Sequence, residues 1–259
     1  MKLEGKVAAI TGGTRGIGRA IADGILAEGG KVAVNGKSEE KGAQALEEMA
    51  VGDRAIFVQG NVQQRTDVDR LVDTTVETFG TIDIMVNNAG GSSGFAPVAQ
   101  LEDAAWEECL NWCLNATFWG TRRALQTMEQ NGWGRVINIS SVEGLHANKA
   151  AVSHYITNKH AINGLTRAVA FEYGPVGITC NALCPGAIET DIMKEVGPQA
   201  AEAMGTTYEG FLDTYAQEAS IKRLNTLEEV ATMAVHLCTD AGSGINGGII
   251  PLHGGTLLA

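Results

Sequence analysis

Residues 7–18 read VAAITGGTRGIG, and they carry the strongest indication of how this chain folds. The first five residues are apolar or β-branched, which predicts a short buried strand. Glycines follow at positions 12, 16 and 18, and residues 15–28 have the apolar spacing of a helix. A strand that passes through a glycine-rich turn directly into a helix is the first half of a βαβ unit.

The same alternation continues along the chain. We predict further strands at residues 31–35, 55–59, 82–86, 135–139 and 178–183, and further helices at 39–49, 65–79, 101–130 and 155–173. The strands are nearly continuous apolar runs, as expected when both faces of a sheet are covered. We therefore predict an α/β fold, a doubly wound parallel sheet with helices on both faces. No repeat or linker divides the chain, which predicts one domain over residues 1–259.

The overall composition is that of an ordinary globular protein. The chain has 259 residues, of which 44% are hydrophobic and 19% charged, and its net charge is −11. A negative chain lacks the basic surface that nucleic acid requires, so no nucleic-acid partner is expected. No apolar run approaches the roughly 20 residues that span a bilayer, and no signal peptide is recognisable. We expect a cytoplasmic protein without a membrane partner, and five free, mostly buried cysteines.

The turn at residues 11–18 has the composition of a phosphate-binding loop. Gly12, Gly16 and Gly18 permit a tight turn and a close backbone approach. The helix that follows presents free amides and a positive dipole end, which suit a pyrophosphate. At the first strand–helix junction of a βαβ chain, this predicts dinucleotide binding.

The end of the second strand indicates which dinucleotide is bound. A carboxylate there would favour NAD(H), whereas a cation would favour the 2′-phosphate of NADP(H). Residues 34–38 read VNGKS, so Lys37 and Ser38 are available for a phosphate, with Arg15 in the neighbouring turn. We predict NADP(H); NAD(H) stays open because Glu39 could reach a ribose, and Lys37 could be a solvated residue.

Tyr155 and Lys159 form a candidate acid–base pair. Residues four apart lie on one face of a helix, so the ammonium can approach the phenol. A free tyrosine titrates near 10. A cation about 4 Å away contributes about 4 kcal/mol at an effective dielectric near 20, before desolvation is subtracted. We therefore expect Lys159 to bring the phenol pKa toward neutral pH, where acid–base catalysis is most effective.

Taken together, the motifs resemble those of the short-chain dehydrogenase/reductase family over nearly the whole chain. The matching segments are TGGTRGIG at 11–18, NNAG at 87–90, INISS at 137–141, YITNK at 155–159 and CPGAIET at 184–190. The resemblance implies a Rossmann-like fold with a parallel sheet of about seven strands. It also implies NAD(P)-dependent oxidation or reduction at a carbonyl or alcohol carbon, and a homotetramer whose copies pack through the helices at 101–130 and 155–173.

The resemblance also assigns roles to individual residues. Tyr155 would exchange a proton with the substrate oxygen, Ser141 would polarise that oxygen, and Lys159 would lower the pKa of Tyr155 and bind the nicotinamide ribose. Ser140 is the competing hydroxyl. The implied cofactor-binding residues are Gly12, Thr14, Arg15, Gly16, Ile17, Gly18, Lys37, Ser38, Asn61, Val62, Asn88, Ala89, Gly90, Tyr155, Lys159, Pro185, Gly186, Ile188 and Thr190.

One position departs from the family pattern. Counting from Trp106, the asparagine that usually completes the proton relay falls on Cys113, and a thiol is a weak hydrogen-bond partner. Asn111 and Asn115 should point about 200° away from Cys113 around a helix. Either the chemistry survives with a water held by backbone carbonyls, or the protein binds cofactor and acts as a regulator with weak or no turnover. Cys109 and Cys113 lack the partners of a metal site, so no metal is expected.

The expected substrate is a small-molecule ketone or secondary alcohol. Residues 91–100, 143–154 and a lid at about 189–220 should surround it. The lid carries Met193, Met204, Tyr208, Phe211 and Tyr215, which suit a medium-sized ketone or cyclic alcohol but would also suit plain packing. His146, Lys149 and His154 precede Tyr155. Lys149 could hold a carboxylate or be a solvated lysine, and His253, near the C-terminus, is expected to be structural.

Overall fold

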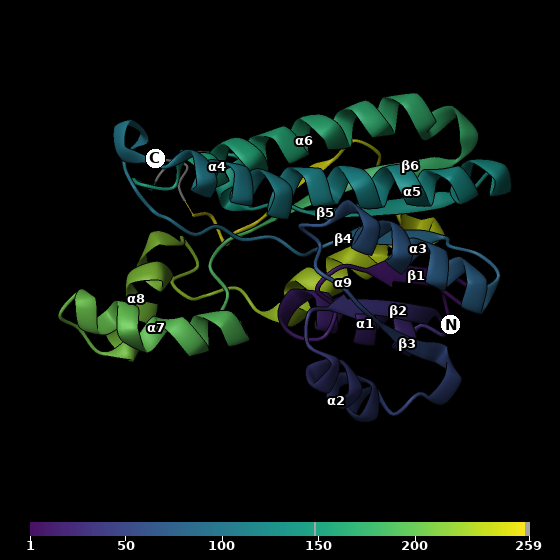
Figure 1. The fold of residues 1–259 in the computed structure, drawn as a ribbon, viewed down its shortest axis with the longest axis horizontal. Helices are drawn as coiled ribbons and strands as arrows, with labels where there is room; N and C mark the ends of the chain where they lie inside the picture. Colours follow the sequence, from purple (N-terminus) through teal and green to yellow (C-terminus); the bar gives the residue numbers. More distant parts are fainter. Residues whose placement is uncertain (148, 257–259) are drawn as a thin grey trace.

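A computed structural model describes residues 1–147 and 149–256 of the chain. One parallel sheet runs through it, with the strand order β3-β2-β1-β4-β5-β6-β7. Strands β2 and β3 lie on one side of β1. After β3 the chain crosses back, and β4 to β7 are added on the other side, as in a doubly wound Rossmann-like sheet (Figure 1). The strands are β1 (Val7–Ile10), β2 (Lys31–Gly36), β3 (Ala55–Gln59), β4 (Ile84–Asn87), β5 (Gly134–Ile139), β6 (Ile178–Pro185) and β7 (Ile249–Leu252). The predicted fold class is confirmed.

Helices cover both faces of this sheet. The described helices of eight or more residues are α1 (Gly16–Ala27), α2 (Glu39–Met49), α3 (Arg65–Phe79), α4 (Asp103–Leu110), α5 (Ala116–Asn131), α6 (Ser153–Tyr173), α7 (Asp191–Ala203), α8 (Tyr208–Glu218) and α9 (Leu227–Cys238). The two largest apolar clusters among the described residues lie on opposite faces of the sheet, one under α1 and α9 and the other under α3, α5 and α6. Alternate residues of a strand enter different cores: Ala8 and Ile10 face the first, and Ala9 faces the second.

The long helix predicted over residues 101–130 is divided in the structure. Helix α4 ends at Leu110, a π-helical turn follows at Asn111–Asn115, and α5 begins at Ala116. The helical spacing of the sequence gives no sign of this wider turn, which inserts an extra residue and rotates the following side chains. It contains Cys113, the position where the family pattern is broken.

The segment expected to be a lid contains two helices, α7 and α8. They lie beyond one end of the sheet, where the start of α7 contacts the start of α1 (Figure 1). Tyr208, Phe211 and Tyr215 pack against one another, with ring centroids 6.4 Å and 5.2 Å apart for the successive pairs. Within residues 1–147 and 149–256, no helix has the length and apolarity needed to cross a membrane.

Candidate active site

The glycine-rich turn places the start of α1 at the end of β1. Gly12 and Gly16 have φ values of +63° and +58°, which glycine adopts at least cost. A Cβ at Gly18 would lie 2.4 Å from the carbonyl oxygen of Gly12, so the helix can approach the turn only without a side chain there. Asn88, after β4, fixes the turn by donating from Nδ2 to the carbonyls of Thr11 (2.9 Å) and Gly12 (3.1 Å).

The start of α1 holds an anionic group in this structure. The Gly16 amide donates to Oδ2 of Asp191 at 3.2 Å, and Asp191 is the first residue of α7. A carboxylate seated on a free amide at a helix N-terminus is a stand-in for a phosphate. The residues around this amide therefore fit the pyrophosphate of a dinucleotide.

A cleft of about 560 Å³ extends from this amide along the carboxyl ends of the strands. Ligands of open α/β sheets bind at this edge, and the volume lies within the range of about 300–1,000 Å³ typical of small-molecule sites. Most of the residues predicted from the sequence line it: Gly12, Thr14, Arg15, Gly16, Ile17, Lys37, Ser38, Val62, Asn88, Ala89, Gly90, Ser141, Tyr155, Lys159, Pro185, Gly186 and Thr190.

Three predicted cofactor-binding residues do not line the cleft. Gly18 packs behind the turn against Gly12, and Ile188 is only 6% exposed within the core beside α1 and α9. Asn61 folds onto its own loop, where its Oδ1 accepts from the Gln63 amide at 3.2 Å. In this structure Gly18 and Ile188 support the cleft from behind, and their contact with a cofactor stays a prediction. The structure likewise gives Asn61 a turn-forming role.

Lys41 and Trp112 also line the cleft, and neither is among the residues predicted from the sequence. The Ser38 hydroxyl caps α2 by accepting from the Lys41 amide at 3.2 Å, so this first turn brings Lys41 beside Lys37. Residue spacing from the helix start could have identified Lys41. Trp112 lies with its ring centroid 5.6 Å from Nζ of Lys37, a position that depends on the π-helical turn and so had no sequence signal.

Ser141, Tyr155 and Lys159 meet at the inner end of the cleft. Ser141 follows β5 and its hydroxyl forms a hydrogen bond with the Tyr155 phenol. Nζ of Lys159 donates to the carbonyl of Ile139 at 2.8 Å and lies 5.3 Å from the centroid of the Tyr155 ring. Ser140, the competing hydroxyl, donates instead to the backbone carbonyl of Lys159 at 3.2 Å. The arrangement places Ser141 beside the candidate acid; the catalytic roles themselves stay predictions.

The pKa values of this group differ from the sequence-based expectation. Burial raises the pKa of the Tyr155 phenol above its ordinary value, and the Lys159 ammonium lowers it only in part. Burial alone would lower the pKa of Lys159, but Tyr155 and Cys113 raise it, so that it stays charged. The expectation that Lys159 brings the phenol toward neutral pH was wrong for this structure, because desolvation of the phenolate exceeds the attraction of one ammonium. At neutral pH, Tyr155 therefore holds its proton.

Cys113 lies directly beside Lys159. The two groups flank Gly90, since a Cβ built there would be 3.3 Å from Sγ of Cys113 and 3.4 Å from Nζ of Lys159. Sγ of Cys113 also contacts the carbonyl of Gly91 at 3.3 Å. A hydrogen bond from Cys109, the charge of Lys159 and the contact with Gly91 together lower the pKa of Cys113 to about 6, against the effect of burial. The same Cys109–Cys113 hydrogen bond raises the pKa of Cys109.

Asn111 and Asn115 point away from this group. Nδ2 of Asn115 donates to Oδ1 of Asn111 at 2.7 Å, and both side chains are half-buried while Cys113 is fully buried. This agrees with the expected orientation around the helix. The position predicted for the relay amide is therefore occupied by a thiol, and neither Asn111 nor Asn115 takes its place.

The loop before Tyr155 reaches the lid. Nζ of Lys149 lies 4.1 Å from the centroid of the Tyr215 ring, so this lysine holds the loop against α8. His154 is fully buried, and its Nε2 lies 3.0 Å from the carbonyl of Ser93, which makes it a loop support. Residue 148 of this loop lies outside the described residues.

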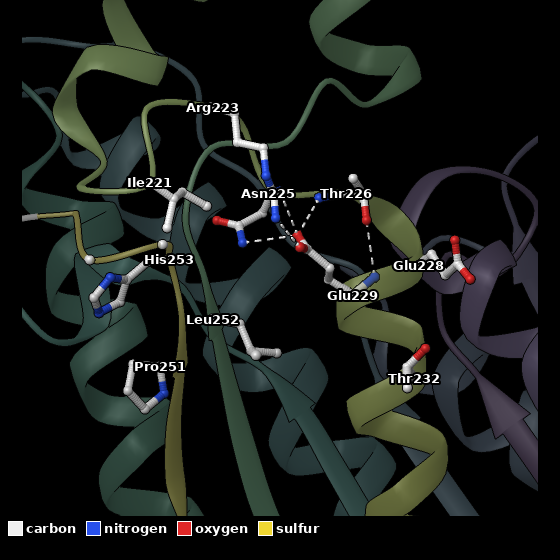
Figure 2. A pocket seen from close by; sticks show the side chains of 12 residues that line it. Ile221, Arg223, Asn225, Thr226, Glu228, Glu229, Thr232, Pro251, Leu252 and His253 are labelled. Carbon is white, nitrogen blue, oxygen red and sulfur yellow. Dashed lines mark hydrogen bonds and ion pairs between the residues drawn. The ribbon is translucent and has the colours of Figure 1, made fainter.

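A second hollow, of about 730 Å³, lies between the start of α9 and the end of β7 (Figure 2). Its central carboxylate, Glu229, accepts hydrogen bonds from Arg223 (2.6 Å), the Thr226 amide (2.9 Å) and Asn225 (3.2 Å). The bond from Arg223 lowers the pKa of Glu229 to about 2. The bond from the Thr226 amide belongs to the capping box of α9, in which the Thr226 hydroxyl also accepts from the Glu229 amide, so Glu229 has a structural purpose. His253 borders the hollow and is only 6% exposed, consistent with the structural role expected for it.

Comparison with known proteins gives concordant matches over most of the chain. A family model described as short chain dehydrogenase matches residues 6–201. A 3beta-hydroxysteroid dehydrogenase 2 of Eggerthella lenta is 36% identical over 255 residues, covering 98% of this chain and 95% of that protein. The 3-oxoacyl acyl-carrier-protein reductase of Aquifex aeolicus is 34% identical over 259 residues, covering 98% of each. A variant of actinorhodin polyketide ketoreductase, solved with NADPH, superposes with a TM-score of 0.90 at 31% identity, over 97% of each chain.

Proposed function

This chain belongs to the short-chain dehydrogenase/reductase family, and on that premise we propose that it interconverts a ketone and a secondary alcohol with NADP(H) as the preferred cofactor. The observation that carries the proposal is the convergence of Ser141, Tyr155 and Lys159 at the inner end of the cleft. The names of the matched relatives, a hydroxysteroid dehydrogenase and two ketone-reducing enzymes, support this reaction type.

Tyr155, Ser141 and Lys159 each have a separate role in the proposed reaction. When bound, the nicotinamide supplies or accepts the hydride. Tyr155 donates its phenolic proton to the carbonyl oxygen during reduction and takes it back during oxidation. Ser141 holds the same oxygen through its hydroxyl, and the charged Lys159 stabilises the phenolate that remains after proton donation.

Cofactor preference follows from the cations at the outer end of the cleft. Arg15, Lys37 and Lys41 line the wall beside Ser38, and no carboxylate of β2 points among them. Three cations that line the same cleft suit a 2′-phosphate better than ribose hydroxyls. We propose NADP(H) as the preferred cofactor and a medium-sized ketone or cyclic alcohol as the substrate.

A substrate panel tests this function. Consumption of NADPH and NADH is followed with ketones, hydroxy acids and sterols, while fluorescence of NADPH measures cofactor binding separately. Faster turnover with NADPH than with NADH on at least one ketone supports the proposal. Absence of NADPH binding contradicts it entirely. Tight NADPH binding without consumption across the panel favours the alternative, a cofactor-binding regulator.

The raised pKa of Tyr155 predicts opposite pH dependences for the two directions. Reduction needs the protonated phenol, so its rate stays level through neutral pH and falls at alkaline pH as Tyr155 loses its proton. Oxidation needs the phenolate, so its rate rises over the same alkaline range. Initial rates measured from about pH 6 to 10 in both directions check this. A reduction rate that falls through neutral pH contradicts it.

Cys113 is the observation that favours the regulator, since a thiol replaces the usual relay amide. We expect Cys113→Asn to change the pH–rate profile of ketone reduction, because position 113 lies beside Lys159. Cys180→Ser, far from the cleft in a buried strand, is the matched control for loss of a buried thiol. An unchanged profile in the asparagine variant would show that this position has no part in the relay.

Further properties follow from the family pattern and stay proposals. We expect a cytoplasmic protein that acts as one NAD(P)-binding domain with the lid at 189–220, and that has no nucleic-acid partner. We also expect a homotetramer packed through the helices at 101–130 and 155–173. Trp106, Phe118 and Phe171 on these helices are 40%, 41% and 86% exposed, which supports an apolar contact there. Sedimentation as a monomer would contradict the tetramer.

A further inference from the structure

The lid helix α7 places two carboxylates on the groups that would bind the cofactor's phosphates. Asp191 accepts from the Gly16 amide at the start of α1. One turn further along α7, Oε1 of Glu195 lies 2.7 Å from Nη1 of Arg15 and 3.8 Å from Nζ of Lys41. These contacts join residues that are about 150 to 180 positions apart in the sequence, so they depend on where the lid rests.

Glu195 forms ion pairs with two of the cations on which the proposed preference for NADP(H) depends. Arg15 and Lys41 both line the cleft, one from the glycine-rich turn and the other from the first turn of α2. A carboxylate and a phosphate are both anions that bind guanidinium and ammonium groups through oxygen atoms. Glu195 and a bound phosphate cannot both pair fully with Arg15 and Lys41. A carboxylate that has lost its cation and lies close to a bound phosphate is repelled by it.

We propose that Glu195 is a specificity-determining residue, which competes with the 2′-phosphate of NADP(H) for Arg15 and Lys41 and so narrows the preference for NADP(H) over NAD(H). The proposal rests on the proposed function, because it requires that the cleft binds these dinucleotides. NAD(H) has no 2′-phosphate, so it can bind while Glu195 keeps both ion pairs. NADP(H) must displace the carboxylate.

The expected size of this effect follows from the exposure of the ion pairs. The side chains of Arg15 and Glu195 are 37% and 54% exposed, so water and salt screen their attraction. Exposed ion pairs contribute little free energy. Loss of this competition should therefore change the dissociation constant of NADPH by about two- to five-fold. Glu195 therefore adjusts the preference and does not determine whether cofactor binds.

The test compares dissociation constants of NADPH and NADH, measured by the fluorescence of the reduced nicotinamide, for the wild type and Glu195→Gln. Glutamine keeps the length of the side chain and removes its charge. We expect NADPH to bind about two- to five-fold more tightly to the variant at low salt, with NADH unchanged. The gain should shrink at high salt, because the competition is electrostatic.

Glu202→Gln is the matched control, since Glu202 lies on the same helix and contacts no cation within the described part of the chain. It should change neither constant. An unchanged NADPH constant in Glu195→Gln, or equal gains for NADPH and NADH, overturns the proposed competition while leaving the proposed function intact. If the wild type binds neither dinucleotide, the proposed function itself fails. Circular dichroism melting curves confirm that both variants are folded.

Discussion

Replacing Tyr155 with phenylalanine is expected to lower kcat for ketone reduction by about 10²- to 10⁴-fold, the usual contribution of a positioned acid. The phenol forms a hydrogen bond with Ser141, and phenylalanine keeps the ring while removing only the hydroxyl. The ring still packs beside Lys159, so the dissociation constant of NADPH should change less than two- to three-fold. Steady-state rates and nicotinamide fluorescence give the two quantities.

Tyr173→Phe is the matched control for this substitution. Tyr173 lies at the far end of the same helix, α6, and packs at the margin of the core under α3 and α5. It should leave kcat within about two-fold, because it is remote from the cleft. If Tyr155→Phe keeps more than a tenth of the wild-type kcat with a good substrate, Tyr155 is not the principal acid and the proposed mechanism must be abandoned.

The second large effect is expected from Gly18→Ala. The new Cβ would lie 2.4 Å from the Gly12 carbonyl oxygen and 2.5 Å from Nδ2 of Asn88, and the first of these atoms belongs to the backbone. Relief requires α1 and the turn to separate, which moves the Gly16 amide away from its anion-binding position. We expect the free energy of unfolding to fall by about 1–3 kcal/mol, as for overpacked cores. NADPH binding should weaken at least ten-fold.

Denaturant titration measures the stability change, and fluorescence titration at low temperature measures cofactor binding to the folded fraction. Gly244→Ala is the control, because a Cβ there meets no atom within 4 Å and its φ is not positive. It should alter stability by no more than about 0.5 kcal/mol. Wild-type NADPH affinity in a stably folded Gly18→Ala protein would show that the close approach of turn and helix is not needed for binding.

The sequence was sufficient for β1 to β6, most of which are largely buried, but β7 (Ile249–Leu252) is only partly buried and was not predicted. Val7–Ile10 and Ile84–Asn87 are wholly buried, and such strands are nearly continuous apolar runs with little ambiguity. The π-helical turn at Asn111–Asn115 could not be predicted in this way. Its residues have ordinary helical spacing, and the wider turn becomes visible only in the hydrogen bonds of the backbone.

The residues of the candidate site could likewise be predicted only in part. Tyr155 and Lys159 are four residues apart on one helix, so spacing was enough to predict that they face each other, whereas Ser141 was added by the family resemblance. Asp191 and Glu195 reach the cleft only because the lid rests on α1, and no local pattern indicates that contact. The pKa of Tyr155 was mispredicted because spacing gives the charge of a neighbour, whereas desolvation depends on the surrounding fold.

The five cysteines are all buried, so their reaction with thiol reagents can report local opening of the fold. Cys238 belongs to the core under α1 and α9, whereas Cys180 belongs to the core under α3, α5 and α6. Burial raises the pKa of each to about 12, so both are closed to thiol reagents and also lack the reactive thiolate. In variants that keep only Cys238 or only Cys180, the rate of labelling by a thiol reagent would therefore measure the opening of each core separately. Equal rates would mean that the two halves of the sandwich separate from the sheet as one cooperative unit.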